Sequence, residues 1–193
     1  MRSRIRWLAR LSAGLPPVAL IVAAFAWTYD IPQFDEWAIV DLLDRHYDGT
    51  LKLADFWRLG LDPTHRPLFT RLVIVALAIP TRWNLLFEQV FHVLLGAGAV
   101  GMLLWFLRAT ARQVPLAGRA WLPAATMLLA CSFTQAEYWL WCWKIETTLC
   151  LLPVLAALAL LCADNLTPFR FVSVLVLASI ATLSYTPGLA VWP

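Results

Sequence analysis

The sequence predicts an all-α protein: a polytopic helical bundle that spans a membrane about five times, with amphipathic juxtamembrane helices in its first outer loop. Of its 193 residues, 61% are hydrophobic and only 14% are charged, and 11 are Trp. The mean hydropathy is +0.71. This composition leaves too little polar surface for a soluble globule. We therefore expect a single transmembrane domain over residues 1–193.

Five apolar runs predict membrane spans, at residues 11–29, 85–107, 120–134, 145–163 and 169–186. A sixth run, 67–80, corresponds to only about 20 Å of helix, against a hydrocarbon core of about 30 Å. It also carries Arg71. We therefore interpret it as a short apolar helix that lies within the outer loop 30–84 without crossing.

The charges predict the orientation of the chain. Arginines precede the first span and separate the second from the third, which places both segments in the cytoplasm by the positive-inside rule (Arg2, Arg4, Arg6, Arg10, Arg108, Arg112 and Arg119). The loop 30–84 then lies on the extracytoplasmic face. The run 11–29 also has the features of a cleavable signal peptide, with Ala24-Phe25-Ala26 as the cleavage site, and cleavage would leave this sidedness unchanged. Because no polar tail follows the last run, we expect an N-terminal portion of a longer protein.

The outer loop is acidic. Eight of the twelve acidic residues fall between residues 30 and 62 (Asp30, Asp35, Glu36, Asp41, Asp44, Asp48, Asp55 and Asp62). The net charge of +3 is small and scattered, so no nucleic-acid partner is expected. The four cysteines form no CxxC pair and lie in or beside apolar runs, which indicates neither a metal site nor a disulfide framework.

Two segments of the outer loop have helical amphipathicity. Residues 36–47 place Trp37, Val40, Leu43 and Tyr47 on one stripe, with Asp41, Asp44 and Arg45 opposite. Residues 51–61 predict a second helix, ended by Gly60 and Asp62-Pro63. Both helices are expected to lie flat at the membrane surface.

The order of several short motifs carries a family resemblance. A DE pair (Asp35, Glu36) follows the first span, His65-Arg66 opens the short apolar helix, and EYWLWCWK and SYTPGLAVWP come later. This order resembles the GT-C class of membrane glycosyltransferases and, more closely, bacterial polytopic proteins described as glycosyltransferase-like. Thr64 stands where that pattern has an acid, and Lys144 where it has Gln. The resemblance implies an inner-membrane enzyme with an extracytoplasmic active face.

No nucleotide sugar is available on that face, so the implied partners are a polyprenyl-phosphate sugar donor and the membrane lipids around it. Asp35 is the candidate base, with Glu36 and Glu137 as further catalytic residues or as ligands of a divalent cation, Mg or Mn. His65, Arg66 and Lys144 are candidates for neutralising the leaving phosphate. Trp139, Trp141 and Trp143 are candidates for stacking on sugar rings.

Each candidate also has a structural interpretation. Asp35 is a suitable helix N-cap, and Glu36 in a first turn favours the helix dipole. His65-Arg66 and the Trp cluster are also typical of membrane-interface anchors, and Glu137 and Lys144 are spaced to pair. Glu88 and His92, four residues apart within a span, are expected to pair with each other or with Arg82. At the level of function, a transporter or flippase and a non-catalytic envelope scaffold remain alternatives.

Overall fold

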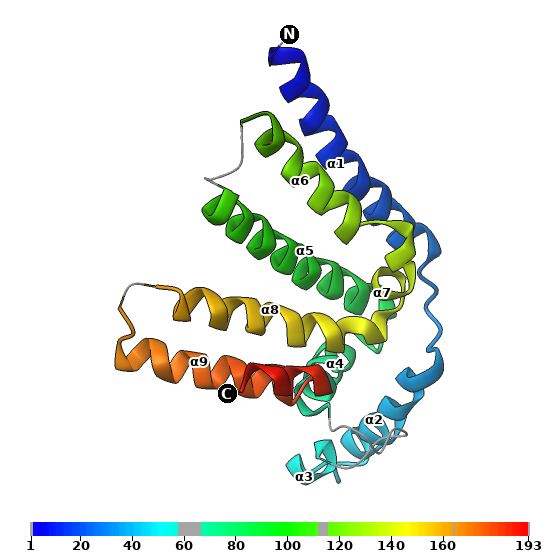
Figure 1. The fold of residues 1–193 in the computed structure, drawn as a ribbon. Coiled ribbons are helices and arrows are strands. Elements are labelled where there is room, and N and C mark those ends of the chain that lie inside the picture. The colour runs from blue at the N-terminus through cyan, green and yellow to red at the C-terminus, as the bar shows by residue number, and fades with distance from the viewer. Residues whose placement is uncertain (1, 58–66, 112–115, 164, 193) are drawn as a thin grey trace.

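The computed structural model describes residues 2–57, 67–111, 116–163 and 165–192, and these residues form helices and no strand. Five longer helices lie side by side in a layer that fans out, in the order α1, α6, α5, α8, α9 (Figure 1). They are α1 (Arg2–Trp27), α5 (Leu85–Thr110), α6 (Leu116–Ala130), α8 (Ile145–Leu161) and α9 (Pro168–Thr182). Each runs antiparallel to the helix that follows it in this group along the chain.

The shorter elements gather at one end of this layer, which we call the site end (Figure 1). It contains the C-termini of α1 and α9, the N-termini of α5 and α8, and eight short helices: η1 (Phe34–Ile39), α2 (Val40–Tyr47), α3 (Leu53–Phe56), α4 (Leu68–Thr81), η3 (Phe133–Gln135), α7 (Ala136–Leu140), η4 (Cys142–Lys144) and η5 (Thr186–Val191). The opposite end, with Thr110 and Leu161, is the far end. Segments that lie far apart in the sequence thus meet at the site end.

Three helical segments are long and apolar enough to cross a membrane, namely Trp7–Trp27, Leu85–Thr110 and Cys142–Leu161. The chain is thus a helical protein with the elements of a membrane protein. The other two predicted spans are shorter helices, since α6 and α9 have 15 residues each. Fifteen residues extend about 22 Å, less than a hydrocarbon core of about 30 Å. If α6 crosses the membrane, the crossing segment must also include η3 and α7, which follow α6 toward the site end.

The short apolar helix α4 packs against α2, α3, α5 and α8 at the site end. Its N-terminus is held to the segment after α9, because Phe69 N–H donates to the Leu183 carbonyl at 3.1 Å and Thr70 Oγ1 donates to the Ser184 carbonyl at 3.3 Å. Arg82 and Trp83 then adopt positive φ and turn the chain into α5. The interpretation of this run as a non-crossing helix stays a prediction.

Two apolar clusters form the core. The first joins η1, α2, α3, α4, η4 and α8 through ten buried side chains, among them Ile39, Leu42, Leu43, Ile74 and Trp143. The predicted stripe on 36–47 is therefore wrong in part, because Ile39, Leu42 and Leu43 face inward while Trp37 and Tyr47 are exposed. The buried face of this segment is the one that packs against α4. The second predicted helix of the loop begins as α3, and residues 58–61 lie outside the described residues.

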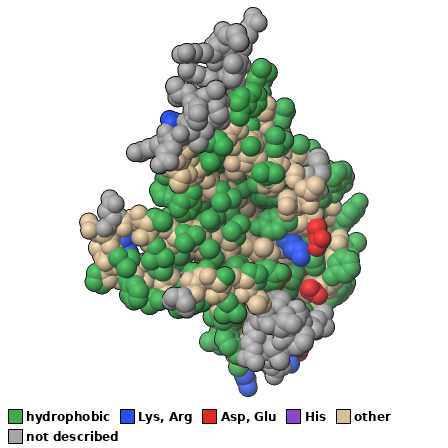
Figure 2. All heavy atoms as spheres, viewed as in Figure 1, with side chains coloured by type: hydrophobic (Ala, Val, Ile, Leu, Met, Phe, Trp, Pro, Cys, Tyr) green, Lys and Arg blue, Asp and Glu red, His purple; other side chains and the backbone are tan. Residues whose placement is uncertain are grey.

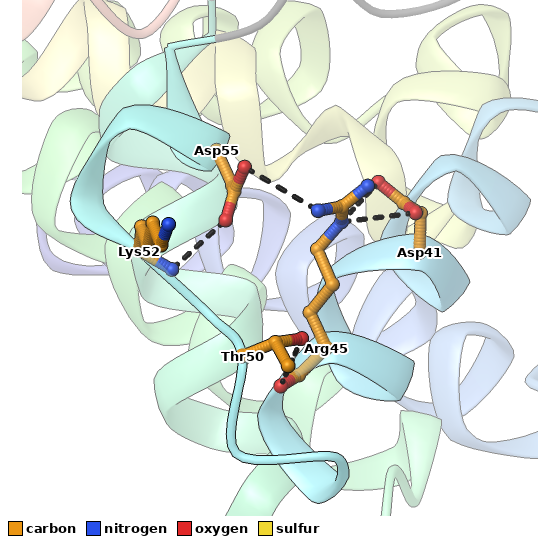
Figure 3. Close-up of polar contacts among 5 residues, drawn as sticks. All are labelled: Asp41, Arg45, Thr50, Lys52 and Asp55. Carbon is orange, nitrogen blue, oxygen red and sulfur yellow. Dashed lines mark hydrogen bonds and ion pairs between the residues drawn. The ribbon is translucent and has the colours of Figure 1, made fainter.

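An ion-pair network fixes α2 against α3 (Figure 3). Arg45 Nε donates to both oxygens of Asp41 at 3.1 Å, and Arg45 Nη1 lies 3.7 Å from Asp55 Oδ1. The other oxygen of Asp55 accepts the Lys52 amide at 2.8 Å. The acids Asp41 and Asp55 of this loop therefore have a structural role that does not depend on a ligand.

The second cluster depends on Trp139, which ties α7 to α5 and α6. Its indole N–H donates to the Ala130 carbonyl at 2.8 Å, and its own carbonyl accepts Gln89 Nε2 at 2.7 Å. Its ring lies directly on Gly96, where a Cβ atom would fall inside contact distance of the ring. Only glycine allows this approach of the ring to α5.

We expect Gly96→Ala to destabilise the protein by about 1–3 kcal/mol, the usual cost of forcing an extra carbon into packed space. Gly101→Ala, on the same helix, is the matched control, because its Cβ would meet no atom within 4 Å. Unfolding in detergent micelles, followed by circular dichroism, measures both. Equal stability of the two variants would contradict the described packing of Trp139.

The alternating helix directions predict which positions share a side of the membrane. Single cysteines placed at Asp48 and Thr134, both exposed, should react with the same membrane-impermeant thiol reagent from one side only. Cysteines at Thr110 and Asn165, at the far end, should react only from the other side, as should the exposed native Cys162. Labelling of Thr134 and Asn165 from the same side would refute the arrangement.

Candidate functional site

The site end contains a small pocket of about 20 Å³, enough for one water molecule. The residues around it come from the end of α1, from η1, from the first turn of α5 and from α7–η4: Thr28, Tyr29, Ile31, Gln33, Glu36, Leu85, Leu140, Trp141 and Cys142. Two of the predicted site residues, Glu36 and Trp141, therefore meet there.

Glu36 is the residue that joins two distant parts of the site. Its side chain is 3% exposed. Oε2 accepts the Gln33 amide at 2.7 Å, and Oε1 accepts the Trp143 amide at 3.2 Å. Burial raises the pKa of the Glu36 carboxyl above its ordinary value, and the two amide donors partly oppose this rise. Both oxygens thus bind backbone, which gives Glu36 a structural role beyond the predicted helix-dipole interaction.

Asp35 precedes Glu36 in η1 and is half-buried. Within the described residues, no hydrogen bond or ion pair reaches its carboxylate, so it does not act there as the N-cap that the sequence also suggested. Gln33 is the N-cap residue of η1. A carboxylate that is partly exposed and not engaged by the chain retains the capacity to accept a proton from a ligand.

Glu137 and Lys144 pair with each other at the rim, with Lys144 Nζ 3.4 Å from Glu137 Oε1. The Glu137 side chain is 77% exposed, so this pair contributes little to stability. Lys144 also lies over the Trp141 ring, 4.6 Å from its centroid. The ammonium thus lies over a residue that lines the pocket, and its ionic partner Glu137 is itself largely exposed.

The three predicted sugar-stacking tryptophans have different environments. Trp139 and Trp143 are 5% and 6% exposed and belong to the two apolar clusters. Trp141 is half-buried, lines the pocket, and has the Phe34 ring packed edge-on at 5.6 Å. Trp141 is therefore the partly exposed member of this group and the one that borders the pocket.

The predicted metal ligands Asp35, Glu36 and Glu137 do not form a metal-binding cluster, and the described residues contain no group of three His, Cys, Asp or Glu side chains that could hold a metal ion. Glu36 already binds two amides, and Glu137 pairs with Lys144. The divalent cation stays a prediction, and no step below depends on it. The predicted phosphate-binding residues His65 and Arg66 lie outside the described residues.

Three acids outside the predicted site also have defined positions at the site end. Asp30 Oδ1 accepts the Leu85 amide at 2.9 Å and so joins the end of α1 to the start of α5. Glu146 is 4% exposed in the first turn of α8, and Glu88 is 1% exposed in the first turn of α5. For Glu146 and Glu88, the sequence signal that could have indicated a buried role is an acidic residue at the start of a long apolar run.

The predicted pairing of Glu88 with His92 or Arg82 is wrong for His92. Both ring nitrogens of His92 are buried and have no hydrogen-bond partner, and the same holds for Glu88 Oε1. The rings of Tyr138 and Trp139 lie next to the imidazole instead.

Comparisons of the chain with models of known protein families, with curated proteins and with solved structures find no match. The resemblance to the GT-C class thus rests on the residues and motifs of the sequence.

We expect Glu36→Gln to weaken the link between η1 and η4, because the amide NH₂ of Gln would face one of the two backbone N–H groups. The loss should be about 1–3 kcal/mol, as for other buried donors left unsatisfied. Hydrogen–deuterium exchange of the peptide that contains Trp143 should accelerate accordingly. Glu137→Gln, at the exposed rim, is the control and should leave this exchange unchanged; equal exchange in both variants would show that Glu36 does not fix η4.

Proposed function

We propose that this protein transfers a sugar from a polyprenyl-phosphate donor to an acceptor on the extracytoplasmic face of a bacterial inner membrane. The observation that carries the proposal is that Glu36 and Trp141, more than a hundred residues apart in the sequence, line one pocket at the site end. Asp35 directly precedes Glu36 in η1, and Lys144 lies over the Trp141 ring. A base, an aromatic surface and a cation are the three groups that such a transfer uses.

The charge distribution supports this orientation. In Figure 2 the acidic side chains visible on this face lie at the right-hand end, which is the site end in Figure 1. The helix termini at the far end carry arginines, namely Arg108 in the last turn of α5, Arg119 in the first turns of α6 and Arg170 in the first turn of α9. The positive-inside rule then favours a cytoplasmic far end and an extracytoplasmic site end.

The reaction requires little of the protein beyond proton transfer and charge stabilisation. Asp35 accepts the proton of the acceptor hydroxyl while the oxygen of that hydroxyl attacks the anomeric carbon of the donor sugar. The bond from that carbon to the donor phosphate breaks, and the polyprenyl phosphate leaves with the bonding electrons. Lys144 stabilises the negative charge that develops on the phosphate, and Arg66 and His65 are the further candidates for this role. Trp141 offers a ring face to the sugar.

Glu36 and Glu137 have supporting roles in this proposal. Glu36 fixes η1 against η4, so it positions Asp35 relative to Lys144 and Trp141. Glu137 orients the Lys144 ammonium through its ion pair. The acceptor therefore binds on the exposed side of Asp35, and the lipid phosphate binds on the Lys144 side.

A transporter or flippase is the second candidate, and one observation favours it: the buried polar side chains Glu88 and His92 lie inside the long apolar helix α5. Ionisable groups in a membrane span often belong to substrate or proton pathways. This candidate does not explain why the carboxylate of Asp35, next to the pocket residue Glu36, has no partner among the described residues.

The test is Asp35→Asn, which removes the base while nearly preserving its shape. Sugar transfer from a polyprenyl-phosphate donor in lipid nanodiscs should fall by two or more decades, about 3 kcal/mol of activation free energy. Asp44→Asn, in the exposed face of α2, is the matched control and should be as active as the wild-type protein.

Wild-type activity of Asp35→Asn would remove Asp35 as the base. If a transporter is the correct function, the nanodisc assay should show no transfer by the wild-type protein, whereas lipid movement across proteoliposomes should depend on Glu88 and His92.

A further inference from the structure

A polar stripe on α5 lies inside the protein next to the pocket. Glu88, Gln89 and His92 occupy its first two turns and are 1%, 0% and 0% exposed. Gln89 is satisfied, because its Nε2 donates to the Trp139 carbonyl at 2.7 Å and its Oε1 accepts Cys142 Sγ at 3.2 Å. Glu88 Oε1 and both His92 nitrogens have no hydrogen-bond partner among the residues that the structure describes. Three unsatisfied polar atoms thus lie within one helical turn.

Aromatic rings enclose the His92 imidazole. The Trp139 ring stacks on it with centroids 6.1 Å apart and planes inclined by 18°, and the Tyr138 ring meets it edge-on at 5.8 Å. Trp139 is itself fixed by its bonds to Ala130 and Gln89. The imidazole therefore cannot turn toward a protein partner without disturbing α7. The buried indole N–H of Trp83 lies close enough to the Glu88 carboxyl to interact with it, although the two groups do not reach ordinary hydrogen-bond geometry.

These atoms match the hydrogen-bonding capacity of water. A neutral imidazole offers one donor and one acceptor, the indole offers a donor, and a carboxyl oxygen is an acceptor. Each buried polar group left without a bond costs about 1–3 kcal/mol, so several together would be a large fraction of the stability of a domain. Enclosed water with about three hydrogen bonds is the common remedy in proteins.

The stripe adjoins the pocket through Cys142 and Leu85. Both residues line the pocket, and Cys142 Sγ lies 3.7 Å from the Leu85 carbonyl and 3.2 Å from Gln89 Oε1. Glu88 is close enough to Glu36, which also lines the pocket, to be affected by its charge. Water from the pocket thus has a short polar route along the first turn of α5.

We propose that Glu88, His92 and Trp83 form an internal water-binding site, through which His92 exchanges protons with the pocket at Glu36. The titratable groups that face this site are Asp30 at the end of α1, Glu36 in η1, Tyr138 in α7 and Cys142 in η4. A proton enters from water in the pocket and returns to it, so no other reactant is needed. The site does not depend on sugar transfer, and it would equally serve a proton-linked transporter.

The test is solid-state NMR of the ¹⁵N-histidine-labelled protein in lipid bilayers, with magnetisation transferred from water to the ring N–H groups. The chain has three histidines, so His92→Gln and His65→Gln assign the signals. Half-buried His46 in α2 is the internal positive control. We expect water transfer to His92 of the same order as to His46, although His92 is fully buried.

Two results would overturn the proposal: no transfer from water to His92 while His46 receives it, or a His92 nitrogen bonded directly to Glu88 without water. Two substitutions of Glu88 provide a second measurement. Glu88→Gln keeps the size and a hydrogen-bonding group and should preserve the transfer, whereas Glu88→Leu should reduce it severalfold. If Glu88→Leu fails to fold, the wild-type and Glu88→Gln spectra decide by themselves.

Discussion

The arrangement at the site end depends on one buried carboxylate. Glu36 accepts a backbone amide from its own segment and another from Trp143, 107 residues later in the chain. A carboxylate removed from water is costly unless donors surround it, so the two amides are required wherever Glu36 is buried. This constraint holds η1 against η4. Without it, Asp35 would have no fixed position relative to Trp141 and Lys144.

Trp139 provides the second constraint. It lies in α7, just before the segment η4 that Glu36 holds. Its ring needs the bare backbone of Gly96, and its carbonyl needs Gln89. The interaction therefore fixes α7 and the start of η4 on α5, which also positions the stacked His92. Together Glu36 and Trp139 hold η1, α7 and η4 against the first turns of α5, where Leu85 lines the pocket.

The sequence predicted the helical class, and three of its five predicted spans correspond to the long apolar helices, because hydropathy patterns act locally. That Asp35, Glu36, Glu137 and Lys144 share one side of a membrane stays a prediction. It did not predict which residues of these motifs are buried. The sequence grouped Trp139 and Trp143 with Trp141 as candidates for contact with sugar or with the membrane interface. Both are instead buried in an apolar cluster. Which side chains of α2 are buried likewise depends on the position of α4. Such differences arise from contacts between distant segments, and no short motif contains them.

The most direct test of the proposed site is photo-crosslinking with a diazirine-bearing polyprenyl-phosphate probe, followed by peptide mapping. The account predicts crosslinks to the peptides that contain Gln33, Trp141 and Lys144, with competition by unlabelled polyprenyl phosphate but not by a phospholipid of equal charge. Crosslinks confined to the far end, around Thr110 and Leu161, or labelling that a phospholipid abolishes equally well, would contradict the assignment of the site end to a lipid-linked donor.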